Sequence, residues 1–174
     1  LVALLVFILQ WLAYIPAFLQ QTERFYDAMG SISFLIASAM LFGHLDAVRG
    51  EHWVLMSLVW FWAIRLGSFL FYRINKEGVD TRFNDIKPNA LRFFVTWNIQ
   101  GLWVVLTLLP LFAVLTSKKD VAFSAIFAVG VTIALMGLVI ETVADHQKWQ
   151  WKHTHKNASF ITSGVWSYAG HPKY

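Results

Sequence analysis

The chain has 174 residues, of which 57% are hydrophobic and 14% are charged, with a formal net charge of +4 and no cysteine. Apolar runs this long and closely spaced exclude an ordinary soluble domain, and the lack of cysteine excludes disulfides, thiolate catalysis and cysteine-based zinc sites. The few positive charges lie mostly in two loops, which excludes the continuous basic face that nucleic-acid binding requires, so we expect an integral membrane protein embedded in a lipid bilayer.

Five apolar segments are long enough to cross a membrane as helices, since a span needs about 20 mostly apolar residues. They cover residues 1–20, 28–45, 52–72, 91–115 and 121–141. Pro16 and Pro110 fall near the ends of their segments, where a missing N–H does little harm. We expect an all-α polytopic transmembrane bundle in which residues 1–174 form one membrane domain, with a polar tail over 142–174.

Basic residues are distributed unequally between the two ends of these spans. The end at which the first span finishes, called side A, carries Arg24, Arg73, Lys76, Arg82, Lys87, Arg92, Lys148, Lys152, Lys156 and Lys173. The opposite end, side B, carries Arg49, Lys118 and Lys119. The positive-inside rule therefore places side A and the tail in the cytosol, for a protein of the bacterial inner membrane or the endoplasmic reticulum.

Three polar residues of the spans are candidates for catalysis. Tyr26 and Asp27 lie at the start of the second span, directly before residue 28, and Arg65 lies within the third. An arginine near mid-span costs about 2.5–3.5 kcal/mol and is usually kept for a partner or a cavity. We predict that Arg65 pairs with an acid on side A, either Asp27 or one of the tail acids Glu141 and Asp145; snorkelling to side A is the alternative.

The fourth span carries Asn98 and Gln100, whose amides allow two interpretations. An amide that faces a bundle interior can hydrogen-bond a substrate carbonyl, as the reduction of an enone would need. Polar contacts that hold helices together explain both residues equally well.

The tail contains a charged stripe followed by an aromatic loop. If Gly137 to His155 form one helix, a face of roughly 80° carries Glu141, Asp145, Lys148, Lys152 and His155. Such a stripe can solvate the end of a span, form ion pairs, or orient a polar ligand. His153 and His155 do not share a helix face, so we expect no metal site.

The tail motifs resemble those of a known family. E-x3-D-x6-K followed by G-x-W-x-Y-x2-HP-x-Y resembles the carboxy-terminal signature of steroid 5-alpha-reductase-like membrane proteins, including a branch with E-x2-AD-x-Q-K and GLW-x-Y-S-RHPNY. The ending also resembles isoprenylcysteine carboxyl methyltransferases. Weaker echoes are FYD at 25–27 and W-x2-RLG and D-x-RF at 62–83, while Gly170 and Lys173 replace the family's usual Arg and Asn. Because the family continues beyond this motif, we expect the chain to be a fragment.

The resemblance implies a reductase of a carbon–carbon double bond in a steroid-like, isoprenoid or other small hydrophobic lipid enone, with NADPH as hydride donor. It implies catalytic roles for Tyr26, Asp27 and Arg65, and a lid or cofactor-contacting role for the loop from Tyr72 to Arg92. That loop could equally be a solvated connector. The implied nucleotide contacts are Glu141, Asp145, Lys152, Trp166, Tyr168, His171 and Tyr174, and Lys148 of the charged stripe is a further candidate contact.

Two other function classes stay open. The shared HP-x-Y ending allows a methyltransferase that uses S-adenosylmethionine on a lipid or prenylated carboxylate. A non-enzymatic transport or structural membrane protein would also suit an arginine that lines a cavity. Binding of NADPH or of S-adenosylmethionine distinguishes among the three.

Overall fold

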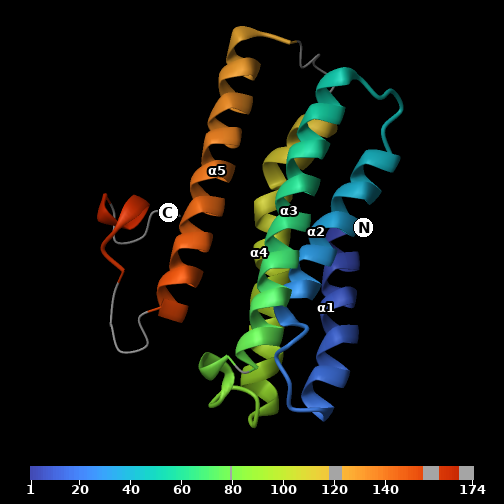
Figure 1. Cartoon of the computed structure of the whole chain (residues 1–174). Coiled ribbons are helices and arrows are strands. Elements are labelled where there is room, and N and C mark those ends of the chain that lie inside the picture. The colour runs from blue at the N-terminus through green and yellow to red at the C-terminus, as the bar shows by residue number, and fades with distance from the viewer. Residues whose placement is uncertain (79, 118–122, 155–160, 169–174) are drawn as a thin grey trace. The chain divides into compact units, whose positions relative to one another are not determined.

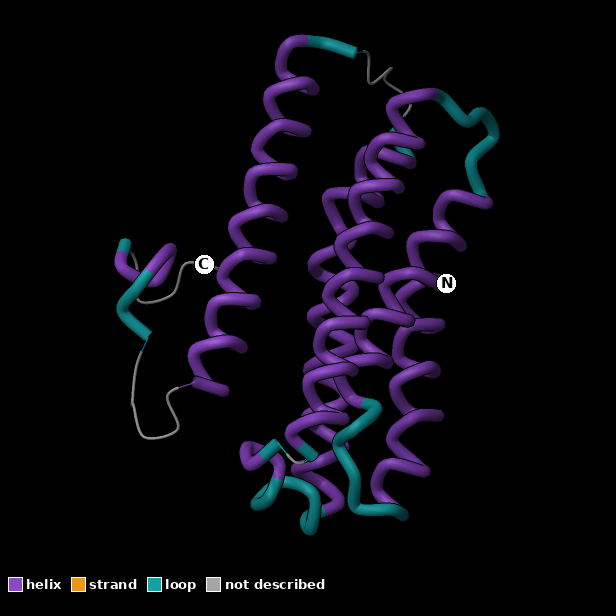
Figure 2. Tube along the Cα trace, viewed as in Figure 1, coloured by secondary structure: helices purple, strands orange, loops and turns teal. Residues whose placement is uncertain are grey.

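The computed structural model describes residues 1–78, 80–117, 123–154 and 161–168, and within them the chain is helical with no strand (Figures 1 and 2). The long helices are α1 (Val2–Leu19), α2 (Tyr26–Gly43), α3 (Gly50–Glu77), α4 (Ala90–Leu115) and α5 (Ala125–Thr154). Two short 3-10 helices are η1 (Thr81–Phe83) and η2 (Gly164–Ser167). All five long helices are long and apolar enough to cross a membrane, which confirms the predicted all-α fold.

Two of the helices extend beyond the spans expected from hydropathy. α3 continues to Glu77, and α5 is one continuous helix to Thr154, so the tail stripe is helical as predicted up to that residue. At 1.5 Å per residue, helices of 28 and 30 residues measure about 42–45 Å, which exceeds the roughly 30 Å of bilayer hydrocarbon. Each therefore carries polar turns that do not need to lie in lipid.

The chain divides into two compact units, an N-terminal unit Leu1–Asp120 and a C-terminal unit Val121–Tyr174. The prediction that residues 1–174 form one membrane domain requires these two units to associate, and it stays a prediction. The N-terminal unit is a four-helix bundle in which α2 packs against α1, α3 and α4, and α1 also packs against α4. Helix α2 is thus the central element of this unit.

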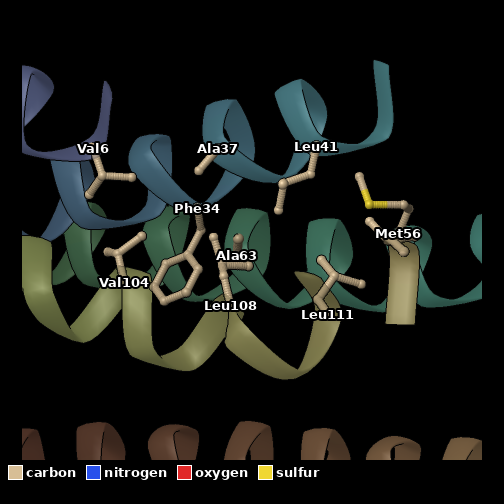
Figure 3. Close-up of a cluster of buried hydrophobic side chains, with 10 residues drawn as sticks. Val6, Phe34, Ala37, Leu41, Met56, Ala63, Val104, Leu108 and Leu111 are labelled. Carbon is tan, nitrogen blue, oxygen red and sulfur yellow. The ribbon is translucent and has the colours of Figure 1, made fainter. Parts of the chain in front are cut away.

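The bundle interior contains a continuous cluster of apolar side chains (Figure 3). Its buried members are Val6, Phe34, Ala37, Leu41, Met56, Ala63, Val104, Leu108, Leu111 and Leu115. Large apolar side chains also cover the outside of the unit, with Leu12, Phe61 and Trp103 each more than 60% exposed. An apolar exterior is expected where the surrounding solvent is lipid.

Because lipid tails are as apolar as leucine, helices in a membrane associate through close packing and polar contacts. At Gly67 of α3 an added Cβ would lie 2.6 Å from the side chain of Ser31 on α2, so only glycine permits this approach. Hydrogen bonds donated by side chains connect α2 to each of its three neighbours, α1, α3 and α4. They run from Gln10 Nε2 to Ser33 Oγ (2.9 Å), from Trp60 Nε1 to Ser38 Oγ (3.0 Å) and from Gln100 Nε2 to the Tyr26 carbonyl (2.9 Å).

Candidate functional site

The side-A end of the N-terminal unit brings together polar residues and one phenylalanine from four parts of the chain. It consists of the α1–α2 connection, the first turn of α2, the last turns of α3 and the segment 80–89 that leads to α4. We call this group the polar bundle end; its members are Glu23, Tyr26, Asp27, Arg73, Asp80, Arg82, Phe83 and Lys87. The candidate catalytic residues Tyr26 and Asp27 belong to it.

Glu23 fixes segment 80–89 to the start of α2. Its side chain is 4% exposed, forms an ion pair with Lys87 Nζ, and accepts a hydrogen bond from the Asp80 backbone N–H at 2.8 Å. Burial raises the pKa of Glu23, but the hydrogen bonds from Lys87 and from the Asp80 amide outweigh it and hold the pKa below its ordinary value. Glu23 is therefore a buried carboxylate with matched partners.

The D-x-RF sequence forms a local clamp. Asp80 accepts a hydrogen bond from the Arg82 backbone N–H at 3.0 Å and so caps η1, while Arg82 Nε lies 3.0 Å from both carboxylate oxygens of Asp80. The hydrogen bond from Arg82 lowers the pKa of Asp80, and the same contact raises the pKa of Arg82. The clamp holds an exposed, permanently charged guanidinium at the bundle end.

Tyr26 and Asp27 lie beside this clamp. The Tyr26 hydroxyl donates to the Thr96 carbonyl at 3.0 Å, and its ring meets Phe83 and Trp97 edge-on, with centroids 5.1 and 5.2 Å away. Asp27 pairs with Arg73 at 3.8 Å, with both side chains about 30% exposed. The structure thus places a phenol and a carboxylate–guanidinium pair near each other, half-buried at the side-A end of the bundle.

Arg65, the third candidate catalytic residue, is half-buried in α3 and lies eight residues, or about 12 Å, before Arg73. Its pairing with an acid stays a prediction. The amides of the fourth span, by contrast, have clear structural partners: Asn98 accepts a hydrogen bond from Trp11 Nε1 at 3.1 Å, and Gln100 donates to Tyr26 as described above. These contacts support the interpretation that both amides hold helices together.

In the C-terminal unit the aromatic loop docks on α5. Trp166 Nε1 donates to the Ala144 carbonyl at 3.1 Å, and the Val165 N–H donates to Gln147 Oε1 at 3.1 Å. Gly164 adopts φ +66°, and an added Cβ there would lie 2.4 Å from Gln147 Oε1. Glycine at this position thus satisfies both a left-handed backbone and a close approach.

The predicted nucleotide-binding residues differ in accessibility. Asp145 is 4% exposed and Glu141 is half-buried. Lys148 and Lys152 are exposed, with Lys148 Nζ 5.2 Å above the Trp166 ring. Tyr168 is 92% exposed. His155, His171 and Tyr174 lie outside the described residues.

The sequence did not identify two residues, Lys87 and Gln147, whose side chains hold segments of the polar regions in place. Lys87 was counted only as a cytosolic charge, because its partner Glu23 is 64 residues away and no local pattern joins them. Gln147 is the Q of the A-D-x-Q-K run, but it is uncharged and was therefore not included with the charged residues of the stripe. Across the parts of the chain that the structure describes, no group of three His, Asp or Glu side chains could hold a metal ion.

Comparison with known proteins identifies a family over almost the whole chain. The family model described as "Protein of unknown function (DUF1295)" matches residues 13–174. No curated protein and no solved structure matches the chain. The chain therefore belongs to the DUF1295 family, which is related to the steroid 5-alpha-reductase-like proteins.

Proposed function

We propose that this protein is a membrane-embedded reductase that uses NADPH to reduce a carbon–carbon double bond conjugated to a carbonyl in a steroid-like, isoprenoid or other hydrophobic lipid. The observation that carries the proposal is the Asp27–Arg73 pair beside the Tyr26 phenol at the membrane end of the bundle. The relation of the DUF1295 family to the steroid 5-alpha-reductase-like proteins supports the same reaction class.

The chemistry of an enone explains why these groups would be useful. When hydride adds to the β-carbon, negative charge develops on the carbonyl oxygen, and hydrogen-bond donors at a partly water-excluded site stabilise that charge. Tyr26 has a phenolic O–H, now donated to Thr96, that would turn to the substrate oxygen, and Arg73 has a guanidinium held by Asp27. Arg65 would hold the substrate within the bundle.

The residues of the C-terminal unit fit the chemistry of a dinucleotide. Lys148 and Lys152 are exposed ammonium groups that suit phosphate oxygens, and Glu141 suits ribose hydroxyls. Between α5 and residues 161–164 lies a cavity of about 540 Å³ whose lining includes Trp149, Gln150 and Trp151, while Glu141, Lys148 and Lys152 are not among its lining residues. When bound, NADPH would supply the hydride, and these residues would bind and orient it.

Asp145 would orient Lys148 or the docked loop and would not contact the nucleotide directly. Its side chain is only 4% exposed, so a ligand that arrives from solvent has little access to it. Replacement of Asp145 would therefore perturb stability as well as binding. Lys152 is the cleaner probe, since it is exposed.

The test is equilibrium titration of the full-length protein in detergent with NADPH, followed by nucleotide fluorescence, and in parallel with S-adenosylmethionine. We expect NADPH binding that Lys152→Ala weakens about tenfold, or ~1.4 kcal/mol. Arg24→Ala, which removes an exposed cation outside the proposed site, should leave the affinity unchanged. Binding of S-adenosylmethionine alone would favour a methyltransferase, and binding of neither compound would favour the transport or structural alternative.

A further inference from the structure

The side-B end of the N-terminal unit contains a cavity of about 720 Å³ that the proposed reaction does not use. The beginnings of α1 and α3 and the ends of α2 and α4 enclose it. Its volume lies within the roughly 300–1,000 Å³ typical of small-molecule sites. Met40 on its wall is 13 residues along α2 from Asp27, about 20 Å, so the cavity is separate from the polar bundle end.

The lining changes from apolar to polar along the helix axes. Side chains that lie farther into the bundle are aliphatic, among them Val6, Val105 and Leu108. The helix ends contribute the polar lining residues His44, Asp46, Arg49, His52, Thr116 and Ser117. This gradient suits an amphiphile whose chain enters the bundle and whose polar head stays at the rim.

The rim favours a negatively charged head. Arg49 is permanently charged and presents a planar fork that matches a carboxylate. Because His52 Nδ1 accepts the Arg49 backbone N–H at 3.4 Å, the proton of the neutral ring lies on Nε2, which makes this 3%-exposed imidazole a donor. Asp46 is the one carboxylate among the described lining residues.

We propose that this cavity binds a long-chain carboxylate, with the hydrocarbon chain between α1, α2 and α4 and the carboxylate at Arg49 and His52. This inference goes beyond the proposed reductase activity, because it concerns the opposite end of the bundle and a ligand that need not be reduced. It defines a second lipid site on side B.

The experiment compares two photoreactive probes of equal chain length, a diazirine-bearing fatty acid and the corresponding fatty alcohol, on the full-length protein in lipid nanodiscs. Val105→Trp fills the cavity, and Leu106→Trp is its matched control, because Leu106 is next in sequence, half exposed on the outer face of α4 and not part of the lining. Arg49→Gln removes the rim charge, and Arg24→Gln removes a distant exposed cation.

We expect the fatty acid to label cavity-lining residues such as Met40, and Val105→Trp to reduce that labelling at least fivefold while Leu106→Trp leaves it unchanged. Arg49→Gln should reduce labelling by the acid at least fivefold but labelling by the alcohol less than twofold. Equal labelling of the two tryptophan variants would overturn the site. An equal effect of Arg49→Gln on acid and alcohol would overturn the assignment of the carboxylate, and this ratio is readable even if Val105→Trp fails to fold.

Discussion

Replacement of Lys87 by methionine tests the central contact of the polar bundle end. The Glu23 side chain is 4% exposed and that of Lys87 is 14% exposed, so the variant leaves a buried carboxylate without its ammonium partner, held by backbone amides that include the Asp80 N–H. Breaking a buried ion pair by removing one partner costs about 3–5 kcal/mol. Since Lys87 keeps some contact with solvent, we expect about 3 kcal/mol.

The measurement is thermal unfolding of the full chain in detergent at a fixed scan rate, followed by circular dichroism. For chains of about 150–250 residues, 1 kcal/mol shifts Tm by roughly 2–4 °C, so Lys87→Met should lower Tm by about 6–12 °C. Arg24→Met removes an exposed cation from the same side and should change Tm by less than about 2 °C. Adding Glu23→Gln to Lys87→Met should recover part of the loss, because a neutral amide still accepts the Asp80 N–H without a buried charge.

The pH dependence of Tm tests the same Glu23–Lys87 pair in a second way. The folded-state pKa of Glu23 lies below its ordinary value of 4.5, so the stabilisation is present above that value and is lost as pH falls through the folded pKa. In Lys87→Met the burial of the carboxylate dominates, and its pKa should rise. The difference in Tm between the wild-type protein and Lys87→Met should therefore be full at pH 7 and should narrow as the pH falls below 4.5. Equal Tm values for Lys87→Met and Arg24→Met at pH 7 would refute the buried pair.

Three further outcomes are expected. Asp27→Asn should lower the turnover of an enone substrate at least about 100-fold with an unchanged Kd for NADPH, measured by NADPH oxidation and by titration, and unchanged turnover would remove Asp27 from the mechanism. Gly67→Ala should destabilise the α2–α3 contact by about 1–3 kcal/mol, seen as a lower Tm, whereas Gly43→Ala, with nothing within 4 Å, should not. Gly164→Ala and Gln147→Ala should each speed hydrogen exchange of the Val165 amide about tenfold or more, and protection that persists would mean that Gln147 does not hold the loop.

The sequence predicted the helices well because hydropathy reports directly on the solvent of a membrane span. Asp80, Arg82 and Phe83 were also identified, through the resemblance of D-x-RF to the family, and the contact between Asp80 and Arg82 is local in sequence. The partner of Glu23 could not be predicted, because Lys87 becomes its neighbour only after α3 and α4 have each packed against α2. The same reason applies to Arg73, which was counted as a loop charge before the bundle placed it beside Asp27.

The docking of Trp166 shows a different limit. An exposed indole in a motif suggests a ring face for a ligand, but the Trp166 N–H is donated to the Ala144 carbonyl and Lys148 covers the ring. Every residue has a backbone carbonyl, so the amino-acid type at position 144 does not reveal that this residue accepts a hydrogen bond. Sequence alone could therefore identify the motif as important without separating residues that hold it from residues that contact a ligand.

Segment 80–89 is held by one carboxylate at two points, through the Asp80 amide and the Lys87 ammonium. Fixing a backbone costs about 1–2 kcal/mol of conformational entropy per residue, and this segment loses much of that entropy when the protein folds. A ligand that contacts Arg82 therefore meets a preorganised surface and keeps more of its interaction energy as affinity. Because both attachments share Glu23, the segment cannot release at one end alone without leaving that carboxylate half satisfied, and its opening should be a single cooperative event.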